Sequence, residues 1–283
     1  MRRSIILLFG LFFFLGSLVP CAWAQTGFNP EFLGNGAPGP YGGLCAKYFA
    51  SYFNQNGINA HDAETALELE YFSEGFTGAD RKDQLLFLIH APLGYRWEGS
   101  KSGGGLGTVS LLASHFWHLV EGDRANVWFD NGLVVGLPTA TQREGIRIGG
   151  NSFSVSWYQE MFLQWGKWSV SIVPVSVGWG FKDYRTDERG GLALSVANGV
   201  VGRKIGERTN LGLNFGLHLG HLVGSEDAAG NSLGTARRIY VGPAGNVKIK
   251  ENLFLQFGTV VDLNTKGTER GQGLFLALWH HFL

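Results

Sequence analysis

The stretch 211-LGLNFGLHL-219 decides the fold of this 283-residue chain. Five large apolar side chains alternate in it with glycine, asparagine and histidine. A strand with this pattern is apolar on one face and small or polar on the other. A soluble antiparallel sheet that buries one face produces the same alternation. Recurrence of the pattern, strand length and signs of export separate the two cases, and all three favour a membrane-spanning β-barrel.

Residues 1–24 are organised like a secretory signal peptide. Two arginines at positions 2 and 3 precede the apolar run 5–15, and Ala22 to Ala24 form a small-x-small cleavage site. The run is shorter than the roughly 20 residues that a spanning helix needs. Cys21 leaves a lipoprotein signal as an alternative, but Pro20 stands where such signals usually carry a small residue. We therefore predict export, cleavage after Ala24 and a location in the bacterial outer membrane.

The composition suits strands that face lipid. Charged residues are 16% of the chain, below the roughly 25% usual for soluble domains, and the chain holds 43 glycines with nine Trp, eight Tyr and 21 Phe. The formal net charge is zero and no basic block occurs, so we expect no nucleic-acid partner. Once the signal is removed, Cys45 is the only cysteine, which excludes an internal disulfide or a cysteine zinc cluster.

The alternating pattern recurs along the whole mature chain. Most segments are longer than the roughly five or six residues typical of soluble strands. Pro174 would interrupt one ladder and predicts a bulge. The predicted strands are 41–53, 63–74, 83–96, 105–117, 125–137, 151–163, 167–180, 190–202, 211–219, 235–249, 253–263 and 272–282.

The connections between these strands support an even strand number. Connections after even strands include the short ones at 164–166, 204–207 and 250–251, and those after odd strands include the longer ones at 140–150, 181–189 and 222–234. Short periplasmic turns and longer outer loops are expected of such barrels. We predict an all-β fold: a transmembrane antiparallel up-and-down β-barrel of about 12 strands over residues 41–283. An irregular N-terminal leader, 25–40, precedes it.

The order of short motifs resembles the outer-membrane family named for the meta-pathway of phenol degradation. The motifs are Pro40 to Gly43, the pairs Tyr48-Phe49 and Tyr52-Phe53, Gly105 to Thr108, Gly136 to Thr139, Trp165 to Trp168, and Arg238 with Gly242-Pro243. Thr108 and Ala140 depart from the family pattern, and so does Leu283, because such barrels usually end on an aromatic residue that is recognised during assembly. The resemblance implies a barrel that passes hydrophobic or aromatic compounds. The implied partners are outer-membrane lipid, a small hydrophobic or aromatic solute and the barrel-assembly machinery.

Several polar groups admit a catalytic interpretation. His218 and His221 lie near the predicted outer end of a strand, and Ser225, Glu226 and Asp227 follow in the next loop, so a nucleophile and a base could meet there. A histidine at the rim of a barrel is more often part of the interfacial girdle, and we predict no catalytic residues. His280 and His281 point to opposite faces of a strand, and we predict no metal site and no cofactor.

A row of glutamates occupies one face of an early strand. The row is Glu64, Glu68, Glu70 and Glu74. A glycosidase would need carboxylates on opposing walls around a sugar, so we interpret the row as lumen-facing. We expect inward cations on another strand, Arg238 and Lys248, to neutralise it.

These patterns together predict a channel for the passive passage of small hydrophobic or aromatic compounds. The alternatives are a barrel hydrolase acting on lipid or polysaccharide and a closed structural or adhesive barrel. The predicted lumen-lining residues are Glu68, Glu70, Asn126, Asp130, Ser154, Tyr158, Asn214, His218, Gln256 and Asp262.

Overall fold

The described part of the chain consists of strands and their connections. The computed structural model describes residues 41–55, 58–73, 83–120, 122, 124–143, 146–148, 152–183, 187–220, 222–227, 229–266 and 270–282. The predicted signal peptide and leader lie outside the described residues. No helix in the described part of the chain is long and apolar enough to cross a membrane.

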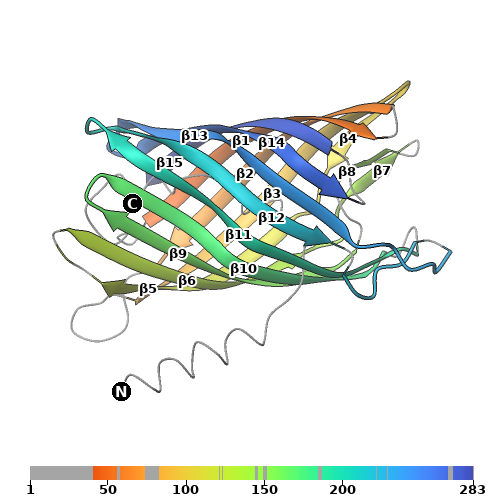
Figure 1. Ribbon diagram of the computed structural model, residues 1–283, viewed down its shortest axis with the longest axis horizontal. Helices are drawn as coiled ribbons and strands as arrows, with labels where there is room; N and C mark the ends of the chain where they lie inside the picture. Colours follow the sequence, from red (N-terminus) through yellow and green to blue (C-terminus); the bar gives the residue numbers. More distant parts are fainter. Residues whose placement is uncertain are drawn as a thin grey trace, which may run out of the picture.

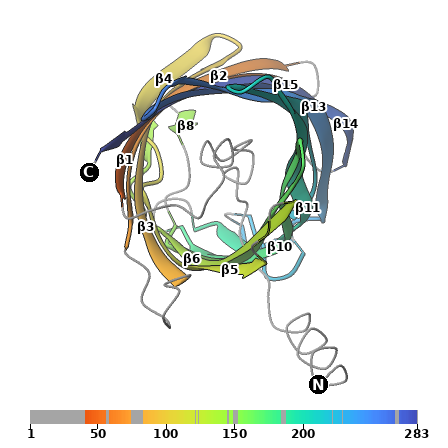
Figure 2. The ribbon, with the colours of Figure 1, turned by 90° about the vertical axis from the view of Figure 1, so that its left-hand side faces the viewer.

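Twelve strands form a closed antiparallel barrel (Figures 1 and 2). They are β1 (Tyr41–Gln55), β2 (Ile58–Phe72), β3 (Asp83–Glu98), β5 (Ser110–Val120), β6 (Ala125–Gly136), β9 (Ser154–Trp165), β10 (Trp168–Lys182), β11 (Arg189–Ile205), β12 (Thr209–Gly220), β13 (Ala236–Lys250), β14 (Leu253–Lys266) and β15 (Arg270–Phe282). Each pairs with the next, and β15 pairs with β1 from Gly42–Phe282 to Asn54–Arg270. The all-β barrel of twelve strands is confirmed.

One predicted strand, 105–117, is divided in two. β4 (Lys101–Leu106) pairs with the second half of β3, and β5 pairs with its first half. The turn after β6 holds the break in place, because Thr139 Oγ1 donates to the Gly107 carbonyl at 2.7 Å and accepts from the Val109 amide at 2.8 Å. The predicted loop 140–150 contains a further hairpin, β7 (Thr141–Arg143) with β8 (Ile146–Ile148).

The two ends of the barrel differ, which we name the turn end and the loop end. The turn end carries the short connections after β9, β11 and β13, and the loop end carries the longer connections after β10 and β12 (Figure 1). The β1–β2 connection is shorter than predicted for the loop end, because the ladder continues to the pair Gln55–Ile58. Asn-Gly stands between them in the sequence, the pair that two-residue hairpin turns favour.

The predicted bulge at Pro174 is confirmed. The register between β9 and β10 shifts between Ile172 and Val175, and β11 shifts against β12 between Val196 and Gly199. Proline has no amide hydrogen for the ladder, so the extra residue leaves the pairing there. As a result, odd-numbered residues of β10 such as Ser171 face inward before the shift, and even-numbered residues such as Ser176 face inward after it.

The outer wall of the barrel is apolar. Leu67 and Leu69 of β2 are 55% and 50% exposed, whereas Glu68 between them is 2% exposed. Exposed large apolar side chains occur on almost every strand of the barrel, and Trp165 and Trp168 flank one turn. A soluble sheet would bury this face, so the pattern is that of a barrel surrounded by lipid.

Candidate functional site in the barrel interior

The ten predicted lumen-lining residues lie on the inward face of their strands. Because side chains alternate along a strand, each shares its face with other buried positions and opposes exposed apolar ones. Glu68, Glu70, Asp130, Tyr158, Asn214, Gln256 and Asp262 are buried, and Asn126, Ser154 and His218 are half-buried. Their contacts divide the interior into a charged cluster, an aromatic wall and a polar group near the loop end.

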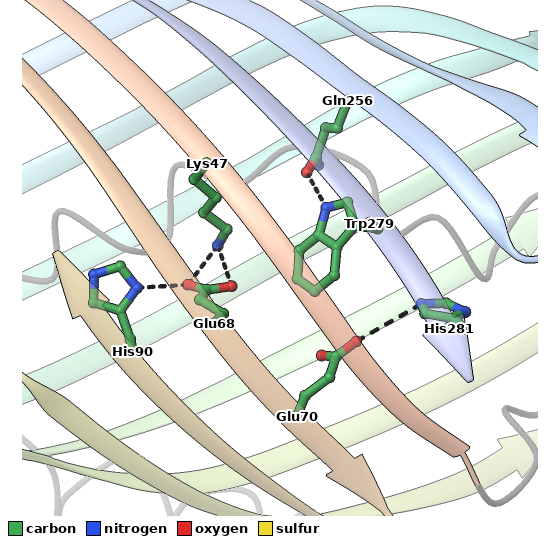
Figure 3. A network of polar contacts seen from close by, with 7 residues as sticks. All are labelled: Lys47, Glu68, Glu70, His90, Gln256, Trp279 and His281. Atoms are coloured by element: carbon green, nitrogen blue, oxygen red, sulfur yellow. Dashed lines mark hydrogen bonds and ion pairs between the residues drawn. The ribbon is translucent and has the colours of Figure 1, made fainter. Parts of the chain in front are cut away.

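The charged cluster lies on β1, β2 and β3 (Figure 3). Glu68 is its centre: Lys47 Nζ lies 2.7 Å from each carboxylate oxygen, and His90 Nδ1 lies 2.8 Å from Oε1. The strand register explains the meeting, because Glu68 stands opposite Cys45 on one side and His90 on the other. A buried carboxylate needs such partners to offset the loss of hydration.

The predicted neutralisation of the glutamate row by Arg238 and Lys248 is wrong. Arg238 forms an ion pair with Asp262 at 2.5 Å, and Lys248 Nζ lies 3.5 Å from Glu251 near the turn end. The neighbouring strands carry the partners instead, because a cross-strand neighbour lies only about 5 Å away. Glu74 lies outside the described residues.

An extension of the charged cluster reaches β14 and β15. His281 Nε2 lies 3.7 Å from Glu70 Oε1, and Trp279 Nε1 donates to Gln256 Oε1 at 3.2 Å (Figure 3). The ammonium group of Lys47 lies 5.1 Å from the centre of the Trp279 ring, within the range of a cation–π contact. Glutamate, histidine and tryptophan side chains therefore meet across the seam between the first and last strands.

The aromatic wall lies on β5, β6 and β9. Phe116, Trp128 and Phe162 pack together with Leu86 of β3, and His118 stacks on Trp128 with ring centres 4.7 Å apart and an interplanar angle of 2°. Contact with lipid does not account for these rings, because they face inward, and the lipid-facing side of the same strands carries other apolar side chains. The interior thus offers apolar as well as polar contacts.

Two carboxylates adjoin the aromatic wall. Asp130 and Glu160 are directly opposed in the β6–β9 register. The Tyr158 hydroxyl donates to Asp130 Oδ2 at 2.6 Å, and the Ser171 hydroxyl donates to Glu160 Oε1 at 2.6 Å. Hydroxyl donors stabilise carboxylates without supplying a compensating positive charge.

Predicted residues nearer the loop end contact other polar groups. His218 Nδ1 lies 3.0 Å from Ser195 Oγ, and its cross-strand neighbour on the other side is Arg238. Two residues of the loop that the catalytic alternative placed near His218 make contacts at the loop end. There Ser225 Oγ donates to the Gly190 carbonyl at 2.5 Å, and Asp227 accepts from the Asn231 amide at 2.8 Å. His221 lies outside the described residues.

The remaining predicted residues make local contacts. Asn126 Oδ1 accepts from the Gly122 amide at 3.4 Å near the turn end. Asn214 lies beside Gly258, where an added Cβ would stand 3.0 Å from Asn214 Nδ2. Ser154 similarly occupies the space beside Gly136. No group of three or more metal-ligating side chains occurs among the residues that the structure describes.

Several inward residues were not among the ten predicted. Lys47, His90, Phe116, Glu160, Phe162 and Trp279 belong to the two clusters. The parity of each strand could have identified Phe162 and Glu160, because both share the face of Tyr158. The weak alternation of β1 gave no comparable signal for Lys47.

This architecture defines the protein as having the fold of outer-membrane β-barrels. An outer-membrane channel from Pseudomonas putida F1 is similar, with a TM-score of 0.74 and 17% identity over 90% of this chain and all of that one. The translocator domain of the autotransporter NalP from Neisseria meningitidis has a TM-score of 0.46 at 12% identity, over 89% of this chain and 91% of that chain. Outer membrane phospholipase A from Escherichia coli has a TM-score of 0.43 at 9% identity, over 91% and 95%. The sequence matches no protein-family model and no curated protein.

Proposed function

We propose that the protein is an outer-membrane channel for the passive passage of small hydrophobic or aromatic compounds. We also propose that the protein is related to the phenol meta-pathway family, because the order of its short motifs resembles the order in that family. The observation that carries it is the closed barrel with an apolar outer wall and an interior that combines aromatic rings with charged groups. Rings such as Trp128 and Phe116 offer flat apolar contacts, and an inward charge disfavours a purely structural core. The similar channel from Pseudomonas putida supports the proposal.

Solute flux into liposomes tests this function directly. Liposomes containing the purified full-length protein should admit phenol and benzyl alcohol faster than protein-free liposomes, and faster than they admit sucrose. A matched pair of variants links the flux to the interior: Ala66 faces inward on β2, and Ala46 faces outward on β1. Ala66→Trp should reduce the flux, and Ala46→Trp should leave it unchanged. Equal flux in both variants, or no flux in the wild type, would refute a passage through the interior.

The contact between Ser195 and His218 favours one second candidate, a hydrolase. A serine hydroxyl at 3.0 Å from an imidazole nitrogen has the geometry of an activated nucleophile. Two observations weigh against it: Ser195 is completely buried, and the cross-strand neighbour of His218 on its other side is the cation Arg238, not a carboxylate that would orient the imidazole. Hydrolysis of a phospholipid or a nitrophenyl ester that is lost in both Ser195→Ala and His218→Ala would favour the hydrolase.

A further inference from the structure

The charges of the barrel interior show an acidic excess. We propose that the channel passes cations in preference to anions, and that its preferred solutes are organic cations that carry both an ammonium group and an aromatic ring. This inference rests on the proposed passage through the interior and adds the substrate class to it. It is carried by the charge balance of the inward residues and by the position of aromatic rings beside carboxylates.

The count of inward charged side chains on the described strands supports the acidic excess. Eight are carboxylates: Asp62, Glu64, Glu68, Glu70, Glu98, Asp130, Glu160 and Asp262. Five of the buried or half-buried inward side chains are cationic: Lys47, Arg96, Lys204, Arg238 and Lys248. Three further inward cations, Lys101, Lys182 and Arg189, are exposed at the loop end beside Glu98, Asp187 and Glu226, and they are not counted with the interior. The difference is three negative charges with histidines neutral. A pore with this excess attracts cations and repels anions, because charged rings bias the ions that enter.

The carboxylates also differ in their partners. Within the described residues, Lys47 pairs with Glu68, Arg96 with Asp62 and Glu98, and Arg238 with Asp262. Glu64, Glu70, Asp130 and Glu160 have no lysine or arginine partner within 4 Å in the same part of the chain. These four carboxylates therefore lack a fixed counter-charge, and three of them border aromatic rings.

The carboxylates of the aromatic wall stand one inward position from its rings. Trp128 and Phe162 are opposed in the β6–β9 register, and Asp130 and Glu160 form the next inward pair. Phe116 stands opposite Asp130 on the other side. Asp130 is 3% exposed, and its Oδ2 atom accepts from the Tyr158 hydroxyl. Gln164 Oε1, one inward position beyond Phe162, is a buried acceptor without a donor in the described structure. The wall thus presents acceptors and ring faces, which complement a donor cation that carries a ring.

The charged cluster already contains an ammonium group that contacts both a carboxylate and an aromatic ring. The ammonium group of Lys47 contacts the Glu68 carboxylate and lies over the Trp279 ring (Figure 3). Glu70 lies one inward position further along β2, with His281 at 3.7 Å. A second ammonium group could therefore pair with Glu70 in the manner in which Lys47 pairs with Glu68. An aromatic carboxylate would meet repulsion from Glu70 at the same place.

The cations near the turn end do not cancel this effect. Lys248 is paired with Glu251, and Lys204 lies near the end of β11.

Reversal potentials across a planar bilayer test the inference. The full-length protein should give a cation-selective potential in a KCl gradient. Replacing K⁺ by phenethylammonium should preserve the current, whereas replacing Cl⁻ by phenylacetate, which has the same ring and two-carbon skeleton, should not raise the anion share. Glu70→Gln, and separately Asp130→Asn with Glu160→Gln, should each lower the cation-to-anion permeability ratio several-fold. Glu207→Gln, in an exposed turn between β11 and β12, serves as the matched control and should leave the ratio unchanged.

The outcomes separate the two proposals. A conducting channel that is anion-selective, or whose ratio is the same in the wild type and both interior variants, overturns the cation preference and leaves the channel function standing. Absence of any conductance and of any liposome flux overturns the channel function itself. If a variant fails to fold, the sign of the wild-type reversal potential alone still decides, because an anionic or zero potential contradicts the acidic interior.

Discussion

An arginine at Leu213 probes the assignment of the outer wall to lipid. Leu213 is 50% exposed and stands four residues from Thr209, where β12 begins at the turn end. A strand that rises about 3.3 Å per residue and tilts by about 40° advances about 2.5 Å per residue along the membrane normal. Leu213 therefore lies about 10 Å into an apolar band about 25 Å tall, close to its centre. Arginine there costs about 2–4 kcal/mol, roughly a hundredfold in the folding equilibrium.

Urea titration of the protein folded in liposomes measures this cost. Ile205, the last residue of β11, provides the control, because it is 54% exposed but lies at the turn end of the barrel. Ile205→Arg should cost about 0–1 kcal/mol, since the penalty for charge falls towards the interfaces. If both variants lose the same stability, or if neither loses more than about 1 kcal/mol, then depth in the membrane does not govern this face and the reasoning fails.

Three further predictions concern the interior and one loop. Lys47→Met leaves the buried Glu68 carboxylate without its cation and should lower the unfolding free energy by about 3 kcal/mol, with much of it restored when Glu68→Gln is added in a double-mutant cycle. Gly216→Ala should cost about 1–3 kcal/mol in the same titration, because a Cβ there overlaps neighbouring side chains, whereas Gly234→Ala meets open space and should be neutral. The hydrogen bond from the Asn231 side chain is the first cause of a lowered pKa at Asp227, so the carboxylate stabilises its loop fully above the unfolded pKa of about 3.9, and the stabilisation is lost as pH falls through the folded value. Amide exchange at Ala229 and Asn231 should accelerate, relative to intrinsic rates, only in that acidic range; a constant protection would contradict this prediction.

The barrel was predictable because alternation is a local property. A period of two in 211–219 and in its counterparts determines which side chains share a face, and lipid on one face makes the alternation strict. Pro174 was likewise informative, since its missing amide hydrogen predicts a bulge from one residue alone. The division of 105–117 was not predictable, because it depends on hydrogen bonds that Thr139, a residue distant in the sequence, makes with Gly107 and Val109.

The contacts of the interior could be predicted only in part. The alternation of side chains along each strand placed Glu68 and Asp130 on the inward face, but it does not determine which residues stand opposite them. Glu68 meets Lys47 and His90 because of the register of β1, β2 and β3, and a change of two residues in either ladder would give it other partners while preserving every face. The choice of Arg238 as its counter-charge failed for that reason: charge complementarity is necessary for a pair, and register decides which pair forms.

The seam between β1 and β15 has a consequence for biogenesis. The first strand of the barrel finds one of its two partners only when the last strand has arrived, so most of the chain must be delivered before the ring can close. Until then two long strands expose unsatisfied backbone groups that invite aggregation. A chain truncated before Arg270 would keep eleven of the barrel strands and still lack a closed wall, so the thirteen residues of β15 complete the backbone pairing that a barrel needs in lipid.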